Sequence, residues 1–245
     1  GVCVADSNYV YFIGGSGTDG ATNKTWRLNK DAQLEEFVSL PVKIDNTAGA
    51  ILGSKIYVVG GNADGKASTR AFCLDLASEN KVWEELPSMP GDPRTQPVCV
   101  ACDSYLYVFG GFAGPADGKS ATLSLSTLCF DPSTKKWSEV ATPKDNNGEE
   151  ISLGGGAGVC IGDKIFCIGG VSKDIFVDAL NGKFERTFYL TQDPSWYQIN
   201  RNILMFEPAT NSWKVLGESE KTARAGAAAV AFGNSFLVIN GEIQP

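Results

Sequence analysis

Three side chains of this chain have the types and spacing of a site that binds an anion and moves a proton. Glu242 follows Asn240 and Gly241, at a point where the chain elsewhere has two consecutive glycines, and Arg94 and Arg224 each lie 16 residues before the first member of such a pair. A carboxylate can act as a general base, and a guanidinium can hold a carboxylate through two parallel hydrogen bonds. We therefore take Glu242 as a candidate proton acceptor and the two arginines as candidate anion-binding residues.

The composition limits the chemistry further, because the 245 residues include no histidine. This excludes, for this segment, a Ser-His-Asp triad, a Cys-His pair and a zinc or copper site with histidine ligands. Acid–base chemistry must come from carboxylates, tyrosines, lysines or groups tuned by arginine. We expect no metal and no organic cofactor.

An internal repeat must position these side chains. Five times, four apolar residues precede a glycine pair, a term that includes the final Asn-Gly. The apolar stretches are residues 10–13, 56–59, 106–109, 165–168 and 236–239, and the pairs are Gly14-Gly15, Gly60-Gly61, Gly110-Gly111, Gly169-Gly170 and Asn240-Gly241. A turn signal and another short apolar stretch come before each, so every unit opens with a β-hairpin. A third strand and then an aromatic residue follow, namely Phe37, Trp83, Trp137 or Trp213.

These units predict an all-β fold, a kelch-type β-propeller with four-stranded blades, since the kelch period is about 50 residues. The second residues of the glycine pairs are 46, 50, 59 and 71 residues apart. A β-sandwich would have similar strands but no aromatic at a fixed offset. We expect a single domain, residues 1–245, with blades at about 1–42, 43–92, 93–142, 143–217 and 218–245, the last incomplete. The chain looks like a fragment of about four and a half blades from a ring of six.

In such blades, the loops between second and third strands and those between blades emerge on one face, which should carry the function. Residues 171–202 form a long insertion in the fourth blade, either a lid or a partner-binding surface. From it, Asp174, Tyr189 and Tyr197 are candidate substrate contacts, as is Asn240. Arg94 and Arg224 have an alternative role, in which they donate to loop carbonyls of a neighbouring blade.

Two other patterns, a glycine-rich motif and the cysteines, could suggest a cofactor, metal or disulfide site, but neither is strong evidence for one. Residues 15–20 match G-x-G-x-x-G, but a strand and not a helix is expected after them, so a dinucleotide site is disfavoured. The seven cysteines lie mostly among apolar neighbours in strands, where cysteine behaves as a small hydrophobic residue. Cys99 and Cys102 point to opposite faces of an extended strand and cannot pair with each other. We expect neither a metal site nor a disulfide.

The formal net charge is −7, and neither sign forms a long run. We therefore expect no nucleic-acid partner. There is no apolar segment of about 18 residues, so we expect no insertion into a membrane. The chain itself leaves the compartment open.

Several segments together resemble the periplasmic kelch-propeller sialic acid mutarotases, also called N-acetylneuraminate epimerases. They are residues 91–96 before 106–111, residues 130–134 with Trp137, residues 169–171 leading to 175–176, residues 206–213, and residues 225–228 running to 239–242 with Pro245. The resemblance covers residues 55–245 and is most specific around Glu242. Residues 1–45 look like the last blade of that family moved to the front.

The resemblance implies an isomerase that interconverts the anomers of N-acetylneuraminate or a related sugar acid by acid–base ring opening. It implies Glu242 as the proton acceptor, a small sugar acid as the partner, no cofactor, and a periplasmic or secreted location. The alternative is a non-catalytic kelch module that binds a protein or a glycan, so a protein partner stays open. A copper oxidase of the galactose-oxidase type is disfavoured, because its metal site needs histidines.

Overall fold

The computed structural model describes residues 1–244, and antiparallel β-sheets dominate it. Four sheets have four strands each, and within each sheet the strands pair in the order in which the chain forms them. The first sheet contains β1 (Val2–Ala5), β2 (Tyr9–Ile13), β5 (Thr25–Asn29) and β6 (Leu34–Phe37); the second contains β8 (Ala48–Leu52), β9 (Lys55–Val59), β12 (Ala71–Asp75) and β13 (Trp83–Leu86). The third contains β14 (Val98–Cys102), β15 (Tyr105–Phe109), β18 (Thr127–Asp131) and β19 (Lys136–Val140); the fourth contains β20 (Ala157–Ile161), β21 (Lys164–Ile168), β22 (Asn202–Glu207) and β23 (Ser212–Glu218). A fifth sheet consists of β24 (Ala228–Phe232) and β25 (Ser235–Ile239).

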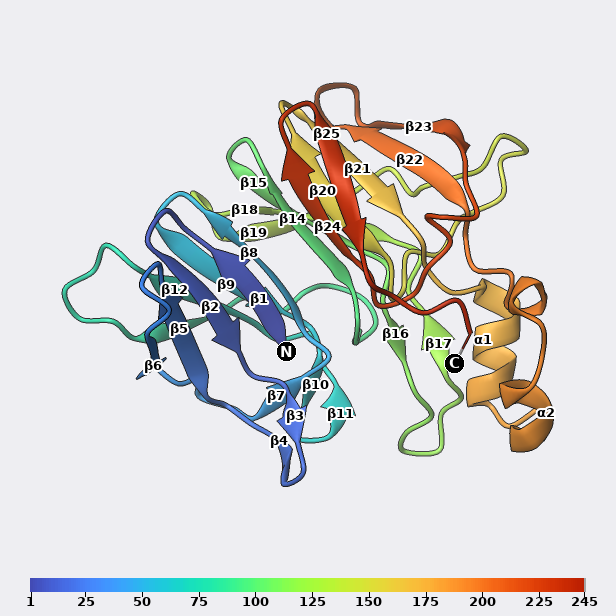
Figure 1. Ribbon diagram of the computed structural model, residues 1–245, viewed down its shortest axis with the longest axis horizontal. Helices are drawn as coiled ribbons and strands as arrows, with labels where there is room; N and C mark the ends of the chain where they lie inside the picture. The colour runs from blue at the N-terminus through green and yellow to red at the C-terminus, as the bar shows by residue number, and fades with distance from the viewer. Residues whose placement is uncertain (245) are drawn as a thin grey trace.

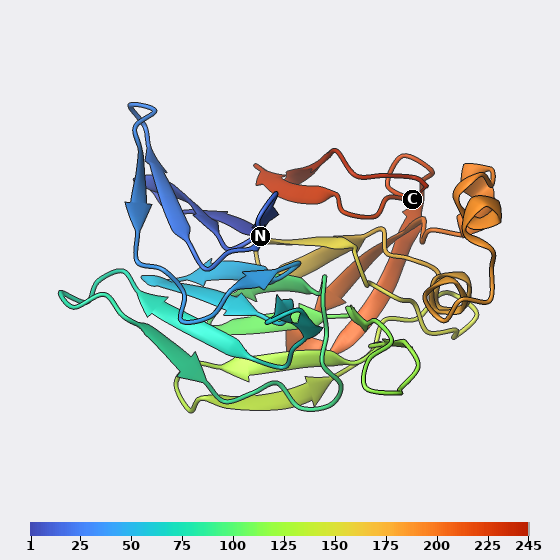
Figure 2. The same ribbon diagram turned by 90° about the horizontal axis from the view of Figure 1, so that it is seen from below.

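These sheets, called blades 1 to 5 below, follow one another around a common centre in chain order (Figure 2). The first strands lie nearest to one another: β8 contacts both β1 and β14, and β20 contacts both β14 and β24. Repeated meanders around one centre are the architecture of a propeller. The predicted kelch-type fold is confirmed.

The glycine pairs set how closely neighbouring blades approach. The first glycine of each pair in blades 1 to 4 has a left-handed backbone with φ between 59° and 66°. A Cβ atom there would lie 2.0–2.6 Å from backbone atoms of the next blade; the contacts are Gly14 with Ile44, Gly60 with Arg94, Gly110 with Leu153, and Gly169 with Arg224. In three pairs the second glycine donates its N–H to that same neighbour, at 2.8–3.2 Å. Only a residue without a side chain allows both the conformation and the contact.

The tryptophans of the fourth strands, Trp83, Trp137 and Trp213, form hydrogen bonds between neighbouring blades. The indole Nε1–H of Trp83 donates to Val38 O at 2.9 Å, and that of Trp213 donates to Ala141 O at 2.7 Å. Trp137 makes the equivalent bond to Pro87 O at 2.8 Å. In each case the acceptor follows the fourth strand of the preceding blade, so the fixed aromatic position connects successive repeats.

The hydrophobic core lies between blades rather than at one centre. One cluster fills the space between blades 1 and 2, another that between blades 2 and 3, and a third that between blades 3 and 4. Each pairs side chains from facing sheets, for example Phe109 of blade 3 with Phe206 of blade 4 at 6.2 Å between ring centres. Burial of this kind supplies most of the stability of a stacked sheet architecture.

Cys102 and Cys160 correct the expectation that no disulfide forms. They are disulfide-bonded, with Cα atoms 5.6 Å apart, and join β14 to β20. Cys99 is free, and Cys99 and Cys102 do not pair with each other, as their opposite facing on the strand predicts. The prediction failed because it considered partners within a strand, whereas the partner lies on the first strand of the next blade.

The connections between second and third strands lie along one side of the molecule, the lower side in Figure 1. They form three hairpins: β3 (Ser16–Gly17) with β4 (Gly20–Ala21), β10 (Asn62–Ala63) with β11 (Lys66–Ala67), and β16 (Phe112–Ala113) with β17 (Thr122–Leu123). Strand β7 (Ile44–Asp45), which lies between blades 1 and 2, pairs with β10. We call this side the loop face. The G-x-G-x-x-G segment thus leads through the β3–β4 hairpin to a strand.

The insertion of blade 4 belongs to the same face and is helical. It contains α1 (Lys173–Leu180), α2 (Arg186–Leu190) and the 3-10 helix η1 (Pro194–Tyr197); a further 3-10 turn, η2 (Pro208–Thr210), connects β22 to β23. Within residues 1–244, no helix is both long and apolar enough to cross a membrane. Pro245, part of the family-like motif, lies outside the described residues.

Candidate functional site

Glu242 lies on the loop face because a short backbone pairing fixes it there. Its N–H donates to Ala225 O at 2.8 Å, and Ala225 N–H donates to Glu242 O at 2.9 Å. Phe112 and Thr95 make the same exchange in blade 3, at 3.0 and 2.7 Å, and Asn62 pairs with Asp45 in blade 2. The residue after each of these glycine pairs is therefore tied to the segment that enters the first strand.

Asn240 takes the place of the first glycine in its pair, and its backbone is left-handed with φ 58°. The first glycines of blades 1 to 4 have nearly the same angle, and asparagine tolerates this conformation better than most residues. The exception in the repeat therefore preserves the turn that presents Glu242.

The helical insertion follows the glycine pair of blade 4 directly, and its far end is bonded back to that pair. The backbone N–H of Asn200 donates to Gly170 O and its side-chain Nδ2 donates to Gly169 O, each at 2.9 Å. At the other end, Ser172 caps α1 by accepting from the N–H of Ile175 at 3.5 Å. A hydroxyl at this position satisfies one of the unpaired donors of the first helical turn.

Helix α1 also contacts blade 3. The ring of Phe176 lies edge-on to that of Phe112, with ring centres 4.8 Å apart, and Asn181 Oδ1 accepts from the N–H of Ala121 at 2.7 Å. The insertion thus begins in blade 4 and packs over the β16–β17 hairpin of blade 3. Such anchoring holds α1 in a defined position on the loop face.

The rest of the insertion is organised by its aromatic side chains. Trp196 packs edge-on against Phe184, Tyr189 and Tyr197, with ring centres 5.2–6.1 Å apart. Tyr197 is 4% exposed, and its hydroxyl donates to Tyr189 O. Perpendicular aromatic contacts of this kind are favourable, so the insertion has a small core of its own.

A small pocket of about 60 Å³ opens between this insertion and Glu242. Its walls come from α1, the aromatic cluster and blade 5; the lining residues are Val171, Ser172, Ile175, Phe176, Tyr189, Tyr197, Ile199, Ala225, Glu242 and Gln244. Three of the candidates chosen from the sequence, Glu242, Tyr189 and Tyr197, are therefore brought to one place. We call this the Glu242 pocket.

The phenol of Tyr189, which lines the Glu242 pocket, has a raised pKa. Burial raises this pKa, and the negative charges of Tyr197 and Glu242 when ionised raise it further. The phenol therefore keeps its proton at neutral pH and can act as a hydrogen-bond donor. A carboxylate acceptor and a phenol donor in one pocket are suited to proton transfer.

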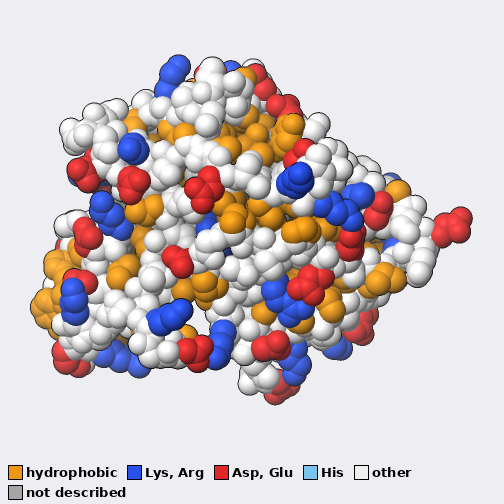
Figure 3. Space-filling view, turned by 180° about the vertical axis from the view of Figure 1, so that it is seen from behind, with side chains coloured by type: hydrophobic (Ala, Val, Ile, Leu, Met, Phe, Trp, Pro, Cys, Tyr) orange, Lys and Arg blue, Asp and Glu red, His pale blue; other side chains and the backbone are white. Residues whose placement is uncertain are grey.

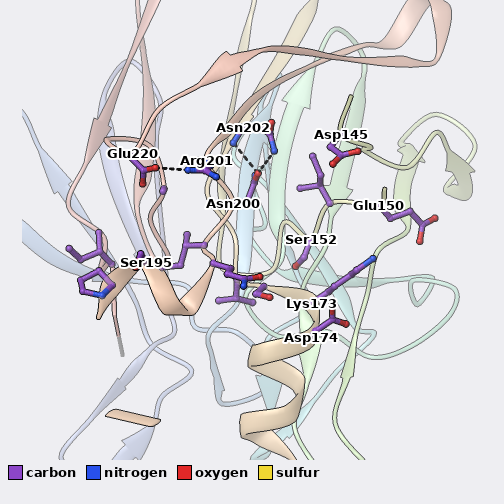
Figure 4. Close-up of a pocket in the computed structure, with 18 of the residues that line it drawn as sticks. Asp145, Glu150, Ser152, Lys173, Asp174, Ser195, Asn200, Arg201, Asn202 and Glu220 are labelled. Atoms are coloured by element: carbon purple, nitrogen blue, oxygen red, sulfur yellow. Dashed lines mark hydrogen bonds and ion pairs between the residues drawn. The ribbon is translucent and has the colours of Figure 1, made fainter. Parts of the chain in front are cut away.

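A larger cleft of about 870 Å³ lies beside the Glu242 pocket and shares Val171, Ser172 and Ile199 with it. Figure 4 shows its labelled side chains, including Asp174 at the start of α1. The cations that line it are already paired: Lys173 lies 3.6 Å from Glu149, and Arg201 lies 2.8 Å from Glu220. Asp174 does not line the Glu242 pocket, so the structure separates this candidate from the others.

Arg94 is the candidate whose expected role the structure contradicts. Its side chain is 1% exposed, and Nη1 donates to Gly110 O and Ser126 O at 3.2 and 3.3 Å. Burial lowers the pKa of the guanidinium to about 10. The group therefore ties backbone carbonyls together between strands and cannot reach a substrate, which is the structural alternative raised above.

Arg224 occupies the same repeat position but is half-buried. Its Nε donates to Lys221 O at 3.0 Å and its Nη1 to Gly241 O at 3.3 Å. Within residues 1–244, Nη2 has no hydrogen-bond partner. One face of this guanidinium can thus serve an anion while the other holds the turn before Glu242.

Sequence reasoning missed the apolar side of the pocket, formed by Ile175, Phe176 and Ile199. The sequence did contain a signal for this helix: Ser172 is a good N-cap, and apolar residues recur over residues 175–180 with helical spacing.

The distribution of surface charge does not point to a binding site. On the face drawn in Figure 3, lysines and arginines are interspersed with aspartates and glutamates, and no basic area forms.

Comparisons with known proteins agree on one family. A family model described as N-acetylneuraminate epimerase matches residues 37–245. The N-acetylneuraminate epimerase of Haemophilus influenzae strain PittEE is 32% identical over 229 residues, covering 87% of this chain and 57% of the relative. That of Yersinia enterocolitica is 31% identical, covering 87% and 56%. The solved structure of YjhT has a TM-score of 0.69 and 28% identity, covering 84% of this chain and 60% of its own. The chain thus spans somewhat more than half the length of these relatives.

Proposed function

Because this chain belongs to the N-acetylneuraminate epimerase family, we propose that the complete protein interconverts the anomers of N-acetylneuraminate or a related sugar acid. The observation that supports this most is the Glu242 pocket, where a carboxylate and a phenol face one space. Both groups lie on the loop face, where a propeller binds its ligands.

Mutarotation needs a base and an acid at the reacting atoms. Glu242 takes the proton of the anomeric hydroxyl while the ring oxygen gains a proton, so the bond between the anomeric carbon and the ring oxygen breaks and a ketone forms. Rotation and reclosure on the other face return both protons. Tyr189, the phenol that lines the same pocket as Glu242, is the donor we assign to the ring oxygen, directly or through a water.

The substrate carboxylate needs a cation near Glu242. Arg224 is our candidate, because its Nη1 already contacts the carbonyl of Gly241, the residue before Glu242, at 3.3 Å. Its remaining donors can bind a carboxylate oxygen by a charge-assisted hydrogen bond. Tyr197 lines the Glu242 pocket, and Asn240 forms the left-handed turn before Glu242, whereas Asp174 lines the neighbouring cleft.

The proposed location is the periplasm or another extracytoplasmic space. The Cys102–Cys160 disulfide supports it, since disulfides persist in oxidising compartments and are rare in the cytosol. We propose a small sugar acid as the ligand and no nucleic acid.

The proposal is tested by an NMR time course of freshly dissolved α-N-acetylneuraminate. We expect the complete protein to speed the appearance of the β anomer, and Glu242→Gln to lose this acceleration by about 10²-fold or more, the size of an acid–base contribution. Asp174→Asn is the matched control, because it removes an acid from the adjacent cleft only, and it should stay active. Equal rates for wild type, Glu242→Gln and buffer would leave the non-catalytic kelch module as the better description.

A further inference from the structure

A series of three backbone hydrogen bonds links the loop-face ends of neighbouring blades. Asn46, Gln96, Gly155 and Gly226 occupy equivalent positions shortly before the first strands of blades 2 to 5. Gln96 N–H donates to Asn46 O at 2.7 Å, Gly155 N–H to Gln96 O at 2.9 Å, and Gly226 N–H to Gly155 O at 2.8 Å. We call these four residues the collar. Blades 2 to 5 are thereby bonded, each to the next, at the entrance to their first strands.

All four collar residues have left-handed backbones, with φ values of 47°, 48°, 69° and 65° in chain order. Glycine adopts this conformation freely, and Gly155 and Gly226 are the expected choice. Glutamine is an unfavourable residue here, because its Cβ crowds the backbone when φ is positive. Residues in such conformations cluster at functional sites, which directs attention to the side chain of Gln96.

The amide of Gln96 is exposed and held in place from one side only. Its Nε2 donates to Asn46 Oδ1 at 3.2 Å, and Asn46 Nδ2 in turn donates to Asp45 Oδ1 at 3.1 Å. Within residues 1–244, Gln96 Oε1 accepts no hydrogen bond. The collar therefore presents an oriented amide with a vacant acceptor on the loop face.

Gly155 leaves a space between this amide and blade 5. A Cβ on Gly155 would lie 3.4 Å from Gln96 Oε1 and 3.8 Å from the Cβ of Ala225. Ala225 is the residue whose backbone pairs with Glu242. Gln96, the space over Gly155, and the Ala225–Glu242 pair thus follow one another across the loop face.

We propose that Gln96, oriented by Asn46, binds a neutral hydroxyl or acylamino group of the sugar acid whose anomeric centre lies at Glu242. This inference rests on the proposed function. A neutral amide both donates and accepts, which suits hydroxyl and amide groups of a sugar and gives no preference for its carboxylate. The collar thereby supplies specificity for the uncharged part of the substrate, opposite the groups that transfer protons.

The test compares Gln96→Gly with Gln96→Asn and with Ala32→Gly in the complete protein. Gln96→Gly removes the amide and relieves the left-handed backbone, so folding is preserved, and Gln96→Asn restores an amide. Ala32→Gly is the matched control, because Ala32 has φ 59° in the turn between β5 and β6 of blade 1. Mutarotation kinetics and saturation-transfer NMR with N-acetylneuraminate are measured for each variant.

We expect Gln96→Gly to raise KM by about 3- to 10-fold, the size of one or two hydrogen bonds, with kcat changed less, and to weaken saturation transfer. Gln96→Asn should recover part of this loss, and Ala32→Gly should behave as wild type. If wild type is active and Gln96→Gly has an unchanged KM, the inference is wrong and the proposed function stands. If wild type binds the sugar without accelerating mutarotation, the proposed function fails, and the saturation-transfer comparison alone decides the role of Gln96. Absence of binding by wild type would overturn both.

Discussion

Phe112 and Glu242 occupy the same repeat position in blades 3 and 5, and helix α1 packs on the first and lines a pocket with the second. Each exchanges two backbone hydrogen bonds with the segment before its first strand. Phe112 packs edge-on against Phe176 of α1, and Glu242 lines a pocket with that same phenylalanine. One blade thus anchors the helix, and the other supplies the carboxylate to the pocket that the helix lines.

The first prediction follows from this anchoring. Phe112→Ala should free the α1 side of the Glu242 pocket, because the Phe176 ring loses the partner 4.8 Å away. We expect faster hydrogen–deuterium exchange over Lys173–Leu180, with little change in the strands of blade 4. Phe232→Ala is a suitable control, since Phe232 is 72% exposed. Unchanged exchange in α1 would show that Phe112 does not hold the helix.

The second prediction separates two effects of the glycine pair. Gly53 and Gly60 have nearly identical φ values, 60° and 61°, but a Cβ on Gly53 meets nothing within 4 Å, whereas one on Gly60 would lie 2.5 Å from Arg94 O. Gly53→Ala should therefore cost only the backbone strain, about 1–2 kcal/mol of unfolding free energy. Gly60→Ala should cost that and a further 1–3 kcal/mol or more from the blade contact. Urea unfolding measures both, and equal losses would mean that close approach of blades is not what selects glycine.

The repeat could be recognised in the sequence because the residues that define it are each required by the structure at one fixed position of the unit. Gly110 must be a glycine for its backbone angle and its contact with Leu153, and Trp137 must carry an N–H donor to reach Pro87 O. Such requirements recur at the same place in each unit. The predicted hairpins, the meander order and the shared loop face are therefore confirmed.

Features that depend on contacts between residues far apart in the chain could not be predicted from the sequence. Arg94 and Arg224 look alike in the sequence, and burial alone separates them: Arg94 is enclosed between strands, and Arg224 is half-buried. The partner of Cys102 lies 58 residues away on another blade. Local sequence periodicity does not show which strands of two neighbouring blades face each other. Neither the different burial of the two arginines nor the partner of Cys102 could therefore be predicted without the three-dimensional structure.

The third prediction concerns the Cys102–Cys160 disulfide. It closes a long loop between β14 and β20, and loss of a native disulfide typically costs about 2–4 kcal/mol. Cys160→Ser should lower the unfolding midpoint, and a reducing agent should lower that of wild type but not that of the variant. Cys3→Ser is the control, because Cys3 is a free and exposed thiol. A wild-type midpoint that reductant leaves unchanged, with free thiols demonstrated, would contradict the role assigned to this bond.

The fourth prediction is a loss of stability at alkaline pH that originates in buried phenols. Burial is the main cause that raises the pKa values of Tyr11, Tyr57, Tyr107 and Tyr189, and Tyr11 also donates to Asp6 Oδ2 at 3.0 Å. Unfolded tyrosines titrate near pH 10. Above about pH 10 the unfolded chain therefore releases protons that the folded chain retains, and the free energy of unfolding falls as pH rises. Below about pH 10 this contribution is fully present.

Tyrosinate absorbance measures this directly. Of the seven tyrosines, those four should stay protonated in the folded protein past the pH at which the same protein in urea is fully ionised. Tyr11→Phe should remove one late-titrating phenol from the folded protein and make the fall in stability above pH 10 less steep. A single titration step for all seven tyrosines, at the same pH with and without urea, would show that these phenols are not protected by the packing between blades.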